Sequence, residues 1–127
     1  MSTGLRIIPA DEIALHFPSA RGLEPYTRVS NPIFLGTYHS EPFCLVGLIP
    51  QQESGVVAIW GWNSPLVADH PYIYARWGRR LIHRIHTLYP TIIGQCPLAK
   101  LKWLRSLGAT FTFDTNHLAT FRIEAPQ

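Results

Sequence analysis

The chain has 127 residues, of which 46% are hydrophobic and 15% are charged. This composition excludes a disordered polypeptide, and the length predicts a single domain over residues 1–127 with a buried core. No apolar run approaches the length of a membrane span, and the first residues lack the features of a signal peptide. The isolated cysteines Cys44 and Cys96 indicate buried free thiols, so we expect a soluble protein of the cytoplasm.

The formal net charge is only +3, but the charges are unevenly distributed. No acidic residue occurs between Asp69 and Asp114, whereas seven of the eleven basic residues lie there. This asymmetry predicts a positive surface that attracts phosphate, nucleic acid or an acidic protein. The seven are Arg76, Arg79, Arg80, Arg84, Lys100, Lys102 and Arg105.

In the first half of the chain the patterns predict a strand, a short helix and three more strands. Asp11 is a suitable cap for an amphipathic helix that carries Ile13 and Phe17 on one face, and Pro18 ends or breaks it. A loop that can include one helical turn follows over residues 19–32. The strands, of which the last three form an antiparallel meander, are expected at 5–9, 33–38, 43–49 and 56–60.

The second half begins with a strongly basic helix from about residue 70 to residue 89. Its apolar residues recur at helical spacing, and Pro90 ends it. Because this helix crosses over between strands 56–60 and 91–94, the two strands are expected to be parallel. A second helix over 98–107 ends at Gly108, and a hairpin follows. The helix-spaced apolar residues are Trp77, Leu81, Ile85 and Leu88, and the hairpin strands are 110–113 and 118–123.

This order, β-α-β-β-β-α-β-α-β-β, predicts an α+β fold with a mixed central sheet of about seven strands and helices on its faces. A strand that enters a helix through a short loop places backbone N–H groups and the positive end of the helix dipole together. Such a position favours an anion, typically a phosphate. The connection from the strand 56–60 into the basic helix is therefore the first place to look for a cofactor.

The order and the residues at its centre resemble the GNAT superfamily of acyl-CoA N-acyltransferases. The best local match is 101–111, which resembles the family's helix ending at a Leu-Gly turn before an aromatic strand. The opening Arg6–Ala10 followed by Asp11 is similar to the family's first strand and helix. Within the superfamily the chain looks most like small divergent members encoded by phages and described as internal virion proteins.

In an active member, the resemblance implies a cofactor arm between strands like 56–60 and 91–94, with strand N–H groups polarising the thioester carbonyl. A glycine motif before the central helix wraps the diphosphate. Aligned on Leu81, this chain keeps only Gly78 of that motif, because Arg76 and Tyr74 occupy other glycine positions. Binding of CoA would then involve Ile59, Trp60, Arg76, Gly78 and Arg79.

The family's second signature is also altered. Pro97 stands where an Asn opens the next helix, and Leu104 stands where a Tyr protonates the departing thiolate. Our main hypothesis is therefore a non-catalytic GNAT-like phage protein, a structural or assembly component without cofactor or catalytic residues, with virion association expected. The alternative is a divergent acetyl-CoA-dependent N-acyltransferase that uses water or another residue as the acid.

One face of the basic helix, formed by Arg76, Arg80, His83 and Arg84, is a candidate partner-binding surface. Its expected partners are proteins of a larger assembly, including phage virion proteins, and an oligomer is a further expectation. A nucleic-acid-binding module is the second alternative function. No membrane partner is expected, and a solvated helix face is the simpler interpretation.

Other candidates have weaker support. His83 and His86 are three residues apart, but no carboxylate lies in their segment, so we predict no metal site. As a nucleophile, Cys96 would need a base and a lowered pKa; His70 or His86 could serve as the base, but Cys96 lies at a strand end before Pro97. Glu53 or Asp69 is the candidate general base of an active enzyme, although either suits an ordinary turn.

The tryptophans divide into two expected groups. Trp77 and Trp103 have helical spacing and are expected in the core. Trp62, beside Gly61, is the tryptophan expected to be exposed and available for stacking on a base.

Overall fold

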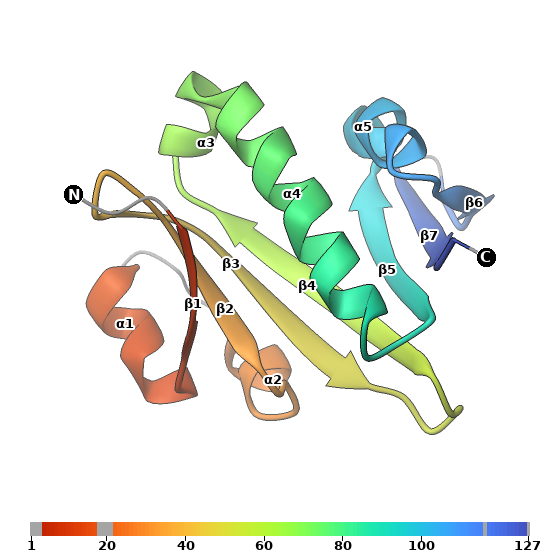
Figure 1. The fold of residues 1–127 in the computed structure, drawn as a ribbon, viewed down its shortest axis with the longest axis horizontal. Helices are drawn as coiled ribbons and strands as arrows, with labels where there is room; N and C mark the ends of the chain where they lie inside the picture. The colour runs from red at the N-terminus through yellow and green to blue at the C-terminus, as the bar shows by residue number, and fades with distance from the viewer. Residues whose placement is uncertain (1–3, 18–21, 116, 127) are drawn as a thin grey trace. The chain divides into compact units, whose positions relative to one another are not determined.

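The computed structural model describes residues 4–17, 22–115 and 117–126. A seven-stranded sheet has the order β1-β2-β3-β4-β5-β7-β6 (Figure 1). Strand β4 pairs with β5 in parallel, whereas the β1–β2, β2–β3, β5–β7 and β6–β7 pairs are antiparallel. The predicted mixed α+β sheet is confirmed. The strands are β1 Gly4–Ile8, β2 Ile33–Tyr38, β3 Glu41–Pro50, β4 Val56–Asn63, β5 Thr91–Pro97, β6 Thr110–Phe113 and β7 Leu118–Glu124.

The helices agree with the predicted types but differ in their bounds. The basic helix starts at Pro71 and ends at His86, and a separate short helix precedes it. The predicted break at Pro18 lies outside the described residues. The helices are α1 Ile13–His16, α2 Glu24–Thr27, α3 Leu66–Asp69, α4 Pro71–His86 and α5 Leu101–Ser106, with 3-10 turns at Ala10–Glu12 and Leu98–Lys100.

The chain folds as two compact units, residues 1–50 with 60–74 and residues 51–59 with 75–127. In the first unit, β1, β2, β3 and α1 share one apolar cluster, because their alternating residues point to the same side. Trp60 and Trp62 of β4 pack against this cluster. The β2–β3 turn places His39 and Ser40 at φ 49° and 66°, as a two-residue hairpin turn requires. The cluster is Ile8, Ile13, Phe17, Ile33, Leu35 and Leu45.

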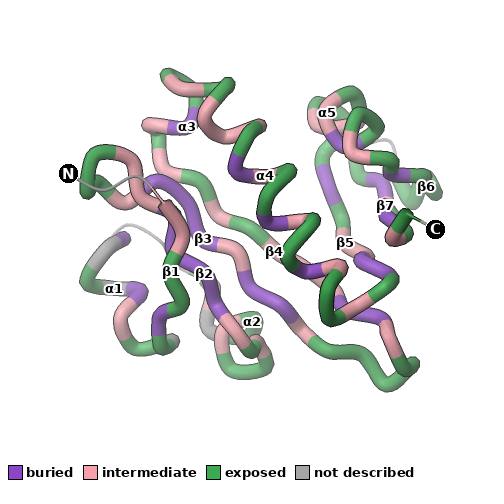
Figure 2. Tube along the Cα trace, viewed as in Figure 1, coloured by how far each residue is buried: buried purple, intermediate pink, exposed green. Residues whose placement is uncertain are grey.

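The second unit contains the start of β4, most of α4, and everything after it. Helix α4 buries Trp77, Leu81 and Ile85 at spacings of four, as predicted (Figure 2). Leu88, the fourth residue of the predicted stripe, is exposed, because the helix ends at His86. Gly94 of β5 lies opposite Phe121 of β7, whose ring occupies the place of a side chain at Gly94. Among the described residues, no helix is both long and apolar enough to cross a membrane.

Candidate functional site

The parallel pairing between β4 and β5 is short. It runs from Val56↔Thr91 to Ala58↔Ile93, only three residue pairs, although β4 continues to Asn63 and β5 continues to Pro97. A strand that has lost its neighbour keeps backbone groups able to bond another molecule. The segment of β4 after Ala58 is therefore the first candidate binding edge.

The phase of β4 identifies which backbone groups face β5. Thr91 N–H donates to the carbonyl oxygen of Gly55, and the carbonyl oxygen of Ile59 lies 3.0 Å from where a Cβ on Gly94 would stand. Because backbone groups alternate along a strand, Ile59 and Gly61 continue the phase of Gly55 along β4, and Trp60 has the opposite phase. Sequence reasoning named Ile59 and Trp60 and considered Gly61 only as a bulge.

The start of α4 changes the interpretation of the glycine motif. The helix begins at Pro71, seven residues before Gly78, so Tyr74 and Arg76 are helical residues and not part of the preceding loop. The segment that precedes α4 is instead Ser64–His70, which contains α3 and no glycine. The alignment on Leu81 therefore compared residues inside α4, whereas close approach of a phosphate to the backbone was expected in the segment before the helix.

Gly78 has a packing role inside α4. A Cβ at this position would stand 2.5 Å from Cζ2 of Trp103, so the missing side chain lets the α5 indole lie against the helix. Arg76 and Arg79 on the same helix are exposed. Of these three predicted cofactor residues, the two arginines are the ones accessible to a ligand.

The connection from β4 into α4 carries polar groups in the first unit. The Asn63 side chain hydrogen-bonds Tyr74, and burial raises the pKa of the Tyr74 hydroxyl while this bond acts in the other direction. The Ser64 hydroxyl oxygen is buried and has no hydrogen-bond partner within the described part of the chain. Buried hydroxyls are normally paired, so this oxygen is suited to a ligand or a water molecule.

The two tryptophans of β4 are anchored to the protein. Nε1 of Trp60 donates to Oγ of Ser30 at 2.6 Å, and its ring fills the space beside Gly47. Trp62 is half-buried and meets Phe17 edge-on, with ring centroids 4.6 Å apart. The prediction that Trp62 is exposed for stacking is wrong, because even-numbered β4 side chains point to the α1 side of the sheet.

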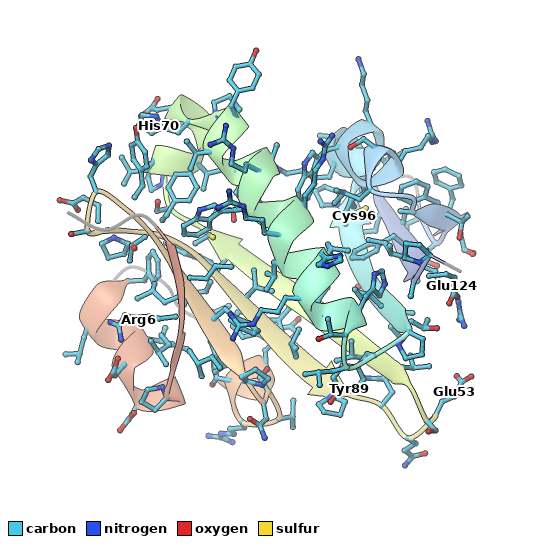
Figure 3. The ribbon with its side chains drawn as sticks, in the orientation of Figure 1. Arg6, Glu53, His70, Tyr89, Cys96 and Glu124 are labelled. Carbon is cyan, nitrogen blue, oxygen red and sulfur yellow. The ribbon has the colours of Figure 1, made fainter. Side chains whose placement is uncertain are left out.

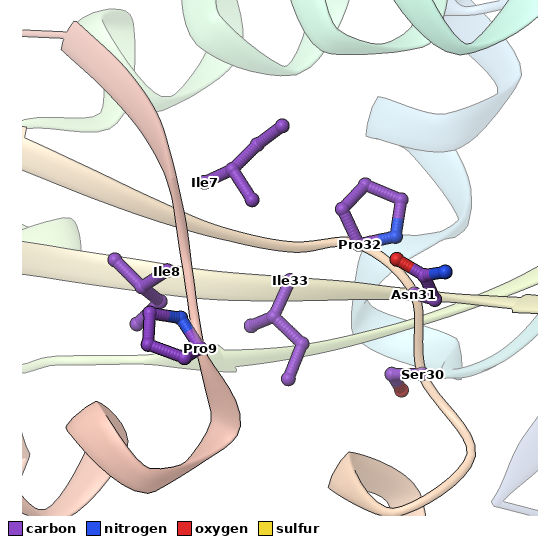
Figure 4. A pocket seen from close by; sticks show the side chains of 7 residues that line it. All are labelled: Ile7, Ile8, Pro9, Ser30, Asn31, Pro32 and Ile33. Carbon is purple, nitrogen blue, oxygen red and sulfur yellow. The ribbon is translucent and has the colours of Figure 1, made fainter.

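A pocket of about 360 Å³ lies in the first unit, where β1 ends and β2 begins (Figure 4). Its walls are mainly aliphatic, and its polar side chains are Ser30 and Asn31. The Ser30 hydroxyl already accepts from Trp60 and donates to the Tyr26 carbonyl, so it offers little to a ligand. The sequence analysis proposed none of its lining residues as site residues. They are Ile7, Ile8, Pro9, Ser30, Asn31, Pro32 and Ile33.

The remaining chemical candidates of the second unit do not gather into a site. Cys96 is buried, which raises the pKa of its thiol and disfavours the nucleophilic thiolate. Glu53 lies exposed in the turn before β4, six residues ahead of Ile59 (Figure 3). His86 Nε2 is 3.2 Å from the Ile123 carbonyl oxygen. In the described ranges, no three His, Cys, Asp or Glu side chains form a metal-binding group.

Leu104 occupies the place that the resemblance gives to a proton-donating Tyr. Its side chain is buried in α5 and belongs to the core. Asp69, the other candidate general base, is exposed at the end of α3 in the first unit. Leu104 therefore offers no proton to a leaving group, and Asp69 is described within the first unit alone.

The strand order, the parallel β4–β5 pair and the crossover through α4 define the GNAT acetyltransferase fold. A Bacillus subtilis acetyltransferase in complex with CoA matches with a TM-score of 0.72 at 10% identity, covering 98% of this chain and 100% of that one. A GNAT acetyltransferase from Elizabethkingia anophelis with acetyl-CoA bound matches with a TM-score of 0.65 at 13% identity, covering 94% and 96%. The spermidine N-acetyltransferase of Vibrio cholerae gives 0.69 at 12% identity, covering 94% of each chain. No protein-family model and no curated protein matches the sequence.

These neighbours contradict the main functional hypothesis. They are acetyltransferases, two of them with CoA or acetyl-CoA bound, and they favour the alternative of an acyl-CoA N-acyltransferase over a non-catalytic phage component. They also give no support to the narrower resemblance to phage internal virion proteins. The glycine motif is missing both from the aligned positions inside α4 and from the segment before it, so its loss alone did not distinguish an inactive protein from a divergent enzyme.

Proposed function

We propose that this protein is an acyl-CoA-dependent N-acyltransferase. The observation that carries the proposal is the early end of the β4–β5 pairing, which stops at Ala58↔Ile93 although both strands continue. Solved proteins of the same fold include complexes with CoA and acetyl-CoA. The expectation that no cofactor is used has no support from them.

Two features of the second unit fit such a cofactor. The backbone of Ile59, where the β4–β5 pairing ends, has the phase to bond an extended arm, as a partner strand would. Arg76 and Arg79 are exposed cations suited to phosphate oxygens. Because the connection before α4 has no glycine, we assign the phosphates to these two arginines and not to a glycine loop.

The chemistry expected is transfer of an acyl group from sulfur to nitrogen. The thioester of the bound cofactor supplies the acyl group; the amine forms a C–N bond, the C–S bond breaks, and a thiolate leaves. The N–H of Gly61, which continues the phase of Ile59 along β4, would stabilise the charge that develops on the carbonyl oxygen of a bound thioester. Leu104 has no proton to donate, so the thiolate is protonated by water or by the proton that the amine loses.

The proposal is tested by calorimetric titration with CoA and by thiol release from acetyl-CoA over a panel of amines. Binding in the micromolar range and release with at least one amine are expected. If CoA at about 1 mM shows no binding, and the thiol trace stays flat with every amine, the proposal fails.

Gly61 permits a sharper test with a matched control. Gly61→Pro removes the N–H group and is expected to lower kcat by about 10²-fold, the usual effect of losing one such donor. Gly61→Ala keeps the N–H, and its Cβ would be no closer than 3.5 Å to the Leu45 carbonyl oxygen, so near-normal kcat is expected. Circular dichroism checks the fold of both variants. A folded Gly61→Pro protein with normal kcat would remove this N–H from the mechanism.

A further inference from the structure

We propose that α4 binds the phosphate backbone of a nucleic acid through its arginine face, defined as Arg76, Arg79, Arg80, His83 and Arg84. All five side chains are exposed. They lie on the part of α4 that belongs to the second unit, away from the buried stripe of Trp77, Leu81 and Ile85. This function goes beyond the proposed acyl transfer and does not depend on it.

The arginines are regularly spaced along the helix. Arg76, Arg80 and Arg84 are four residues apart, so each is about 6 Å further along the axis and the row is about 12 Å long. Arg79 and His83 form a second, adjacent row. Like charges four residues apart weaken a helix, so this arrangement works against helix stability unless an anion compensates it.

The second unit supplies almost no compensating charge. It contains eight Lys and Arg residues but only three acidic residues. Asp114 and Glu124 are engaged by side chains of β5 and β7, and Glu53 lies in the turn before β4. Within the described ranges, the side chains of Arg76, Arg79 and Arg80 have neither an ion pair nor a hydrogen bond. Their guanidinium groups are therefore available to an external anion.

The chemistry of the face favours nucleic acid over an acidic protein. Protein interfaces depend on large apolar or aromatic anchors at their centre. From Ala75 to the end of α4 at His86, no large hydrophobic side chain is exposed; the exposed Tyr72 lies in the first turn of the helix and Leu88 lies after its last residue. Its long cations are all arginines, whose planar fork fits phosphate oxygens. Cations without apolar anchors are typical of binding to a sugar–phosphate backbone.

The test uses the full chain and a labelled duplex of about 20 base pairs, with fluorescence anisotropy from about 50 to about 200 mM salt. Contact with about four phosphates predicts a slope of log K against log salt of about −3.6. The double variant Arg80→Ala, Arg84→Ala is expected to make the slope shallower by about 2 and to weaken binding at least tenfold at the lowest salt. Arg80→Lys, Arg84→Lys keeps the charge and is expected to retain the slope.

The matched control is Arg6→Ala, Arg28→Ala, which removes the same charge from exposed positions of the first unit and is expected to leave the slope unchanged. Neither Arg80 nor Arg84 belongs to the proposed cofactor site, so affinity for CoA should be equal in wild type and the alanine variant. The proposal is overturned if the duplex does not bind at low salt, or if the Arg80→Ala, Arg84→Ala variant has the same slope as the Arg6→Ala, Arg28→Ala control. It is also overturned if the Arg80→Ala, Arg84→Ala variant loses affinity for CoA, or if polyglutamate competes as well as unlabelled duplex.

Discussion

Cys44 shows how burial controls chemistry at the scale of one residue. Its side chain is 3% exposed on β3, and loss of solvation raises the pKa of the thiol to about 12. Burial disfavours the charged thiolate, so the thiol stays neutral and unreactive in the folded protein. Cys44 and Cys96 are free and buried, as predicted from the sequence. Neither lies at the sequence spacing of a paired cysteine, and both lie among apolar strand residues.

The raised pKa of Cys44 predicts a loss of stability in alkaline solution. Above the ordinary thiol pKa near 9 the unfolded chain releases this proton while the folded chain keeps it, so the free energy of unfolding falls as pH rises toward 12. The contribution is at most about 1.4 kcal/mol per pH unit. Urea unfolding from about pH 8 to about pH 10.5 measures it. Cys44→Ala is the comparison, because Tyr and Lys residues titrate in both proteins; equal slopes would contradict the prediction.

At the scale of elements, the contact between α4 and α5 reverses the usual effect of a helical glycine. In an exposed helix, Gly→Ala stabilises by about 1 kcal/mol. Here the added Cβ would stand 2.5 Å from the Trp103 ring, so the ring or one of the two helices must shift. The sequence identified Gly78 as the remnant of a cofactor motif, and only the packing of two helices far apart in the chain reveals this second role.

Gly78→Ala is therefore expected to lower the free energy of unfolding by about 1–3 kcal/mol, the usual cost of overpacking. The control is the same substitution in a Trp103→Ala protein, where the space is open and the change should be neutral or stabilising. Urea unfolding of the four proteins gives the coupling between the two positions. An unchanged or higher stability of the single variant would show that α5 does not rest on Gly78.

For the whole molecule, ligand binding and stability are linked. If CoA binds the folded chain alone, a concentration of about 100 times Kd stabilises it by about 2.7 kcal/mol. For a chain of this size that corresponds to a rise in Tm of roughly 10 °C. Thermal unfolding with CoA tests this, with ATP at equal concentration as a polyphosphate without the pantetheine arm. An equal rise with ATP would indicate phosphate binding by the arginines alone.

Several features of the fold were predictable because short-range patterns determine them. Alternation of apolar residues predicted the strands, a spacing of four predicted the buried face of α4, and the crossover helix predicted that β4 and β5 are parallel. The resemblance to GNAT acyltransferases, carried by 101–111 and by the order of elements, is supported by the structural neighbours at the level of the fold.

Other features depended on contacts that no local pattern contains. Residues 64–70 form a connection with its own short helix, so α4 starts at Pro71 and the expected glycine positions fall inside it. The place of β7 between β5 and β6 and the end of β4–β5 pairing after Ala58 are likewise decided by strand partners distant in sequence.

By itself, the sequence determined the types of element, their order and the two free thiols, because hydrophobic period and residue chemistry act over a few neighbouring residues. Only the tertiary structure decided where α4 begins, where the pairing between β4 and β5 ends, and which side chain lies against Gly78. These depend on long-range packing, in which a shift of one residue along a strand or of one turn along a helix changes which groups meet.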